Sequence, residues 1–137
     1  GGGALAAEIA KELRDYAERL EGREQYAVNS FAAAIEGLPE TLAENAGLDP
    51  IDIIVSLRTA HTEGKVTYGL NIDKGKVDDM KKARVIESAL VNRQIVMSAA
   101  EAAQMILKID DVISSKGGGG MGGGMGPGDM GGDMDDE

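Results

Sequence analysis

The chain has 137 residues, a formal charge of −10 and a sequence pI of about 4.5, and it contains neither cysteine nor tryptophan. This acidity excludes nucleic-acid binding by phosphate neutralisation, which needs clustered Lys and Arg, and the missing cysteines exclude disulfides and thiolate metal sites. No long apolar run and no signal peptide is present, so neither membrane insertion nor secretion is indicated, and the cytoplasm is the expected location.

The first third of the chain predicts a helical hairpin. From Ala4 to Leu20, apolar residues recur at steps of three and four positions, which is the spacing of one face of an amphipathic helix. These residues are Leu5, Ile9, Leu13, Tyr16 and Leu20. Gly22 is expected to end this helix, and a second helix is predicted from about Arg23 to Gly37. The residues expected on its buried face are Val28, Phe31, Ala32 and Ile35.

Two further helices are predicted after this hairpin. Pro39 suits the first turn of a short helix that ends near Asn45. Asp49 is placed to cap the next helix, because its carboxylate can accept hydrogen bonds from the free N–H groups of the first turn. Pro50 then occupies the first helical position, where its missing N–H costs nothing. This helix is predicted to run from Pro50 to about Glu63.

The pattern changes in the middle of the chain. Three residues that favour extended backbone, Val66, Thr67 and Tyr68, predict a short strand, and the residues around Gly75 predict a turn. A brief helical segment at residues 77–82 is expected to follow this turn.

The C-terminal part predicts a long helix, a strand and a tail. The helix should run from about Ala89 to Leu107, and a closing strand is expected at residues 109–113. The tail is mainly glycine, methionine and acid, which cannot bury enough apolar surface to offset the entropy of ordering it. We therefore expect one mostly α-helical domain over residues 1–116 and a flexible, disordered tail over residues 117–137.

Taken singly, the candidate functional residues carry weak signals. The glycines at residues 1–3 precede a helix N-terminus, where they could let the backbone approach a nucleotide, although a linker is the commoner explanation. His61 is the only histidine and has no cysteine or second histidine for a zinc site, so a place on the helix surface is expected. The pairs 78–79, 110–111 and 135–136 of aspartates are expected to be solvated charge, because adjacent residues do not face one another.

Several blocks read together resemble the C-terminal half of the equatorial domain of group II chaperonins, the thermosome family. The most specific block is TLAENAGLDPID at residues 41–52. The others are GGGA at 1–4, GREQ at 22–25, GLNID at 69–73, KVDDM at 76–80, AAEAA at 99–103 and ILKIDDVI at 106–113, followed by the Gly/Met-rich tail. The resemblance covers essentially the whole chain in order.

The resemblance implies that this segment contacts ATP. In the family, the opening glycines pass close to the bound nucleotide, and the turn after residue 68 lies beside the adenine. An acidic residue also accepts hydrogen bonds from the ribose hydroxyls, as a carboxylate can. The positions that match these contacts are Gly2, Gly3, Gly69, Asn71, Ile72 and Glu87. The sequence departs from the family at Arg84, where glycine is usual, and at Ser88, where proline commonly follows the acid.

The resemblance also implies what belongs to the rest of a subunit. The family's phosphate-cradling loop, magnesium ligand and water-activating aspartates correspond to sequence upstream of Gly1. Mg²⁺ is therefore expected only in the parent subunit, and no catalytic or metal-ligating residue is assigned to this chain. Such a subunit is an ATP-hydrolysing chaperone whose partners are the other subunits of a double ring and unfolded client proteins.

Two alternatives remain open from the sequence alone. The chain could be a stand-alone helical interaction module without catalysis, or a truncated structural fragment. Its start at Gly1, without an initiator methionine and inside an apparent ligand segment, favours a piece of a longer subunit. Because the family's equatorial core is built from both ends of the subunit, the first and last long helices should be partly uncovered. Poor solubility or loose packing of the isolated chain is therefore expected.

Overall fold

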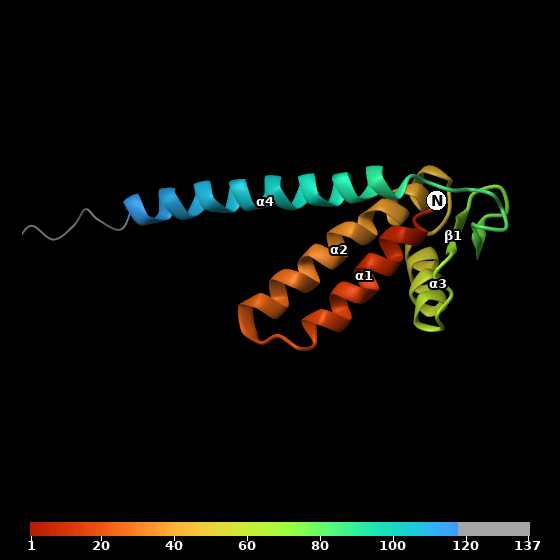
Figure 1. Cartoon of the computed structure of the whole chain (residues 1–137), viewed down its shortest axis with the longest axis horizontal. Coiled ribbons are helices and arrows are strands. Elements are labelled where there is room, and N and C mark those ends of the chain that lie inside the picture. Colours follow the sequence, from red (N-terminus) through yellow and green to blue (C-terminus); the bar gives the residue numbers. More distant parts are fainter. Residues whose placement is uncertain (118–137) are drawn as a thin grey trace, which may run out of the picture. The chain divides into compact units, whose positions relative to one another are not determined.

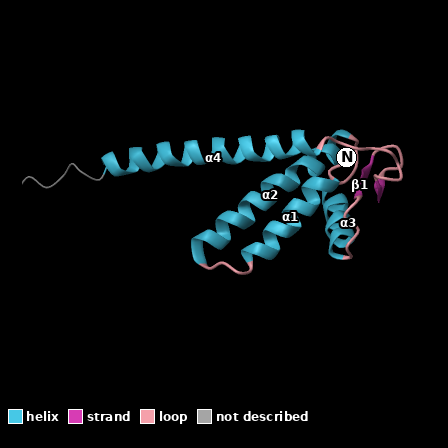
Figure 2. Ribbon diagram, viewed as in Figure 1, coloured by secondary structure: helices cyan, strands magenta, loops and turns pink. Residues whose placement is uncertain are grey.

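The computed structural model describes residues 1–117, with side chains as far as residue 109. The chain divides into two compact units, Gly1–Ala89 and a second that begins at Leu90, and each is described by itself. The elements of the first unit are α1 (Ala4–Ala17), α2 (Gly22–Asn45), α3 (Pro50–Thr62), β1 (Tyr68–Asn71) and β2 (Lys76–Asp79). The described part of the second unit is α4 (Ala89–Gly117), whose first residue still belongs to the first unit (Figures 1 and 2). The predicted fold class, mostly helical with a short strand-turn element, is confirmed.

The helical hairpin of α1 and α2 packs through alanines rather than through the predicted apolar face. α1 buries Ala4, Ala6, Ala7, Ala10 and Ala17. The larger residues of the predicted face are only partly covered: Leu5 remains 40% exposed and Tyr16 51% exposed. Small side chains let two helices approach closely, so the contact face of α1 is its alanine face. The two helices lie side by side in Figure 1.

The predicted break between the second and third helices is wrong. α2 continues through Gly37 and Pro39 to Asn45. A proline inside a helix costs about 3 kcal/mol, because a backbone hydrogen bond is lost and the ring crowds the preceding turn. Here Pro39 is fully buried, and a Cβ built on Gly3 would lie 2.5 Å from the Pro39 Cβ. Close packing against the start of α1 therefore holds Pro39 in a helix that local propensity would end.

The start of α3 follows the prediction. The Oδ1 atom of Asp49 accepts hydrogen bonds from the backbone N–H groups of Ile51 (2.8 Å) and Asp52 (3.4 Å), and Pro50 is the first helical residue. The predicted N-cap is confirmed.

The strand-turn element is confirmed, but the strand begins only at Tyr68, after the predicted Val66 and Thr67, and the helical segment predicted at 77–82 is wrong. β1 and β2 form an antiparallel hairpin with Tyr68 opposite Asp79 and Asn71 opposite Lys76. The carboxylate of Asp79 accepts from the Thr67 hydroxyl at 2.9 Å and from the Lys81 N–H at 3.0 Å, which ends β2 in a turn. Asp79 is thus the half-buried last residue of β2 and not solvated charge, because its carboxylate accepts from groups on both sides of the open end of the hairpin.

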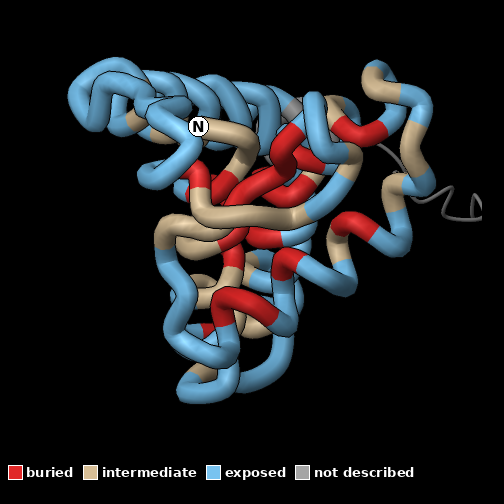
Figure 3. The backbone as a smooth tube through the Cα atoms, turned by 90° about the vertical axis from the view of Figure 1, so that its right-hand side faces the viewer, coloured by how far each residue is buried: buried red, intermediate tan, exposed pale blue. Residues whose placement is uncertain are grey.

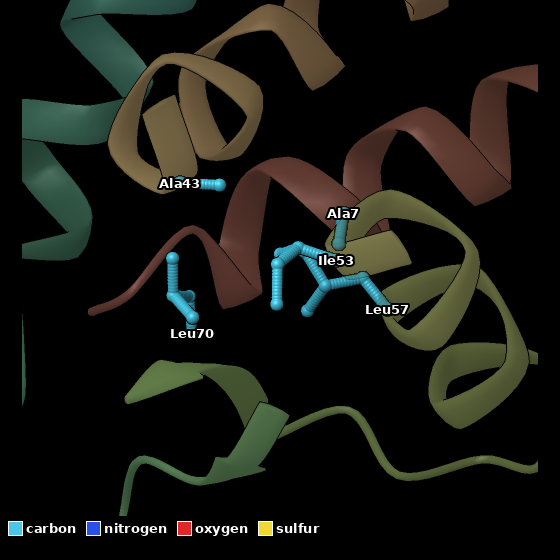
Figure 4. Packing of buried hydrophobic residues seen from close by; sticks show 5 residues of the cluster. All are labelled: Ala7, Ala43, Ile53, Leu57 and Leu70. Atoms are coloured by element: carbon cyan, nitrogen blue, oxygen red, sulfur yellow. The ribbon is translucent and has the colours of Figure 1, made fainter. Parts of the chain in front are cut away.

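The core of the first unit joins all three helices to the sheet. Its buried cluster consists of Ala7, Ala43, Ile53, Leu57 and Leu70 (Figure 4). Figure 3 shows the buried stretches meeting inside this unit, with the exposed ones at its rim. Since Leu70 is only 2% exposed, β1 is anchored by this core.

The described part of the second unit is one helix, and the closing strand expected at 109–113 is wrong. α4 runs through this segment to Gly117. A strand needs a neighbouring edge, and in the part of the chain that the structure describes β1 and β2 pair only with each other. Helical hydrogen bonds need no such partner. The tail predicted from residue 117 lies outside the described residues, apart from Gly117. The exposed large apolar residues of α4 are Leu90, Val91, Ile95, Met97, Met105, Ile106, Leu107 and Ile109.

Candidate functional site

Four of the six residues expected to contact nucleotide line one pocket of the first unit. The pocket has a volume of about 370 Å³, at the lower end of the roughly 300–1,000 Å³ typical of small-molecule sites. The expected residues among its walls are Gly2, Asn71, Ile72 and Glu87. The sequence did not single out the other five, Leu42, Leu70, Asp73, Met80 and Val85, although most lie inside the blocks that carry the resemblance.

Gly2 forms one wall and touches the strand directly. Its carbonyl oxygen accepts a hydrogen bond of 2.7 Å from the N–H of Leu70. A Cβ at this position would lie 2.5 Å from the Leu70 carbonyl oxygen and 2.6 Å from the Met80 Sδ, and the backbone φ is 65°. Glycine is therefore required here by both conformation and space.

Gly3 and Gly69 do not line the pocket. A Cβ on Gly3 would meet Pro39, and one on Gly69 would lie 2.6 Å from the Gly1 carbonyl oxygen. Close backbone packing between the N-terminal residues, α2 and β1 explains both glycines without a ligand.

The pocket combines apolar walls with a few polar groups. Ile72, 52% exposed, and the neighbouring Val85 offer apolar surface. Asn71 is almost buried, and its Oδ1 accepts from the Lys74 N–H at 3.2 Å, which holds the turn of the hairpin. The carboxylate of Glu87 can accept hydrogen bonds from ligand hydroxyl groups. Such a lining offers apolar surface together with a few polar groups to a small ligand.

Arg84 shapes the segment that brings Val85 and Glu87 to the pocket. Its φ is 59°, and within residues 1–117 it is the one non-glycine residue with a positive φ. Its N–H donates to the Lys81 carbonyl at 3.2 Å, and the N–H of Val85 donates to the Met80 carbonyl at 2.9 Å. The turn therefore uses a conformation suited to the glycine that the family resemblance leads one to expect at this position.

His61 is buried, so its predicted place on the helix surface is wrong. Its side chain is fully covered, Nε2 lies 2.8 Å from the carbonyl oxygen of Tyr68, and Nδ1 pairs with the Glu8 carboxylate. A signal was available in the sequence, because Ile53, Leu57 and His61 follow one another at four-residue steps and share the buried face of α3.

A second buried polar group is an ion-pair cluster between the helices. Glu36, 5% exposed, receives hydrogen bonds of 2.6 Å from Arg14 and 2.6 Å from Arg58. Burial alone would raise the pKa of the Glu36 carboxyl, but the hydrogen bonds from the two guanidinium groups outweigh it and hold that pKa below its ordinary value. This cluster connects α1, α2 and α3 and lies outside the pocket lining.

Neither a metal site nor a membrane span is found among the residues that the structure describes. No group of three or more His, Asp and Glu side chains there is placed to hold a metal ion. No described helix is both long and apolar enough to cross a bilayer.

Comparison with known proteins gives a consistent set of relatives. The TCP-1/cpn60 chaperonin family matches residues 1–117. The thermosome subunit beta of Thermoplasma acidophilum is 57% identical over 116 residues, which is 85% of this chain and 21% of that protein. The thermosome subunit of Methanocaldococcus jannaschii is 54% identical over 134 residues, 97% of this chain and 25% of the relative.

A solved structure agrees with these relatives. The open-state monomer of a group II chaperonin from Methanococcoides burtonii matches with a TM-score of 0.75 and 50% identity, over 78% of this chain and 27% of that one. The chain thus spans about a fifth to a quarter of the length of the relatives it matches.

Proposed function

Because this chain belongs to the TCP-1/cpn60 chaperonin family, in its group II branch, we propose that it forms the C-terminal part of the equatorial domain of an ATP-dependent chaperone subunit. In this role it supplies part of the ATP pocket and contacts to neighbouring subunits of a double ring. The complete subunit assists the folding of unfolded proteins in the cytoplasm.

The observation that carries the proposal is the pocket of about 370 Å³. Its walls come from segments far apart in sequence, Gly2 at one end and Glu87 at the other, with the hairpin turn between them. Four of the six residues that the family resemblance selected lie around this single cavity. This convergence is not expected of positions matched by chance.

We assign different parts of ATP to different walls. Ile72 and Val85 contact the faces of the adenine, and Asn71 contributes polar contact at its edge. Glu87 accepts hydrogen bonds from the ribose hydroxyls. Gly2 lets the backbone of the N-terminal segment approach the nucleotide, while Gly3 and Gly69 act indirectly by allowing that segment to pack closely on α2 and β1.

The remaining parts of the machine belong to the rest of the subunit. Other segments of a subunit bind the phosphates, supply the Mg²⁺ ligand and activate the attacking water. The binding of client proteins also belongs to those segments. ATP hydrolysis therefore needs both parts. The described residues of this chain act by binding and orienting the nucleoside.

The test is a titration with a fluorescent ATP analogue. The purified chain is titrated alone and after mixing with a separately produced N-terminal remainder of the related Thermoplasma subunit. Binding and hydrolysis that occur only in the mixture support a nucleotide site divided between the two parts. Absence of binding in both cases favours the inactive interaction module or structural fragment.

A matched pair of variants ties the signal to the pocket. Glu87→Gln changes a lining carboxylate, whereas Glu44→Gln changes an exposed carboxylate of α2 outside the lining. We expect Glu87→Gln to weaken analogue binding by about tenfold, because a charge-assisted hydrogen bond is lost. Glu44→Gln should leave analogue binding unchanged. Equal effects would show that general charge and not the pocket governs binding.

A further inference from the structure

The strand β1 has an outer edge that β2 does not pair. The register places Tyr68 opposite Asp79, and the N–H of Met80 donates to the Thr67 carbonyl at 2.9 Å. In an antiparallel pair, hydrogen-bonded and non-hydrogen-bonded positions alternate, so the backbone groups of Tyr68 and Leu70 point away from β2. Those groups need other partners, because buried backbone groups are rarely left unpaired.

The Tyr68 N–H donates to the Lys65 carbonyl at 3.0 Å, and two more distant segments pair two of the other groups. The N–H of Leu70 donates to the Gly2 carbonyl at 2.7 Å, and the carbonyl oxygen of Tyr68 lies 2.8 Å from the Nε2 of His61. The imidazole thus takes the place of a neighbouring strand on this edge. The pocket residues Leu70, Asn71 and Ile72 begin two positions after Tyr68 in the same hairpin.

The partners of the imidazole determine where its hydrogens lie. A backbone carbonyl only accepts, so the hydrogen bond to Tyr68 requires a hydrogen on Nε2. Nδ1 pairs with the carboxylate of Glu8, which fixes the orientation of the ring from α1. The side chain of His61 is fully covered, so the ring is shielded from bulk solvent.

We propose that His61 is a positioning residue that holds β1 in place for the nucleotide pocket by donating an Nε2 hydrogen bond to the Tyr68 carbonyl. Glu8 orients the ring, and the bond sets where Leu70 and Asn71 stand. The effect of this hydrogen bond on nucleotide affinity rests on the proposed function, whereas its effect on the position of β1 does not. His61 itself lies outside the pocket lining.

The first measurement is amide hydrogen exchange in the complete 137-residue chain without nucleotide. His61→Leu fills the buried site with an apolar side chain and removes both ring nitrogens, while His61→Gln retains an amide donor near the position of Nε2. Glu36→Gln serves as the matched control, since it weakens contacts between the same helices away from β1. NMR of the wild-type imidazole provides a second readout.

His61→Leu is expected to raise the exchange rate of the Leu70 amide, because the buried Tyr68 carbonyl loses its donor and the edge of β1 opens locally. This increase should be about tenfold or more larger than the increase that Glu36→Gln causes at the same amide. His61→Gln should stay within about threefold of the wild type, and the NMR spectrum should show a protected hydrogen on Nε2. If His61→Leu does not fold, the Gln variant and the NMR assignment carry the test. Loss of Leu70 protection in His61→Gln, a ring hydrogen on Nδ1 alone, or equal effects of His61→Leu and Glu36→Gln would overturn the proposal.

Nucleotide binding separates this inference from the proposed function. In the mixture with the N-terminal remainder, His61→Leu should lower analogue affinity by about tenfold and His61→Gln by much less, in parallel with the exchange rates. A wild-type mixture that binds no nucleotide, while His61→Leu still exposes the Leu70 amide, supports the positioning role and counts against the proposed function alone. Exposed β1 with unchanged affinity would overturn the link between His61 and the pocket.

Discussion

The N–H of Leu70 donates a hydrogen bond of 2.7 Å to the carbonyl oxygen of Gly2. It joins the beginning of the chain to a strand that lies almost seventy residues later, as the residue numbers show. Both residues line the same pocket, so this bond fixes the distance between two of its walls. Changes at either residue should therefore affect stability and ligand binding together.

Gly2→Ala should destabilise the first unit and abolish nucleotide binding. The added Cβ would lie 2.5 Å from the Leu70 carbonyl oxygen, in a backbone conformation that L-residues avoid. We expect a loss of about 2 kcal/mol in the free energy of unfolding, measured by urea titration. Gly37→Ala is the control, because a Cβ at this helical position has nothing within 4 Å and should stabilise α2 slightly. Equal losses in both variants would contradict the packing argument.

Arg84 offers a test of backbone strain close to the pocket. With φ at 59°, a residue with a Cβ is less stable in this turn than glycine. Arg84→Gly should therefore be more stable than Arg84→Ala by about 1 kcal/mol, as measured by urea unfolding. The comparison removes the arginine side chain from both variants, so it isolates the conformational effect. Equal stabilities would mean that the turn relaxes when the side chain is shortened.

Glu36 should make the first unit sensitive to acid. The pKa of Glu36 in the folded state lies below the ordinary value of 4.5. The stabilising contribution of its carboxylate to folding is therefore fully present above about pH 4.5, and it is lost as the pH falls through that lowered pKa. Glu36→Gln should cost about 2 kcal/mol at neutral pH, because two guanidinium groups lose a charged acceptor. The gap between variant and wild type should narrow with acidification. Tyrosine fluorescence can follow this, since Tyr16, Tyr26 and Tyr68 all lie in the first unit.

The N-cap of α3 gives a local stability prediction. Asp49→Ala removes the acceptor of the Ile51 and Asp52 N–H groups and should cost about 1 kcal/mol in thermal or urea unfolding. Asp49→Ser should recover most of the loss, because serine also caps helices. If serine were no better than alanine, the charge of Asp49 near the helix dipole would be the dominant contribution.

The exposed apolar side chains of α4 should make the 137-residue chain bind hydrophobic dyes. Seven large residues, including Leu90, Ile95 and Ile106, are more than half exposed. Patches of this kind mark surfaces that another segment covers. We expect the chain alone to enhance the fluorescence of ANS and to unfold in a broad thermal transition. Adding the N-terminal remainder of a related subunit should lower the ANS fluorescence and make the transition sharper. A sharp transition without ANS binding would contradict this expectation.

The sequence by itself determined most of the helices, the cap of α3, the hairpin turn and the family. Periodic apolar residues, the Asp49-Pro50 start signal and the turn residues around Gly75 act over a few positions, so helices, cap and hairpin turn could be predicted without the fold. The candidate pocket residues came from the family resemblance, which compares motifs position by position. Neither kind of inference requires knowledge of which distant segments meet.

Only the tertiary structure decided the features that depend on such meetings. Pro39 stays inside α2 because it packs on Gly3, and His61 is buried because Glu8 and the Tyr68 carbonyl supply partners for its ring. Residues 109–113 are helical in α4, and among the described residues β1 and β2 pair only with each other. For Pro39 and His61, contacts between residues far apart in sequence outweigh the local structural preference of the single residue. Local sequence does not show which distant segments will make such contacts.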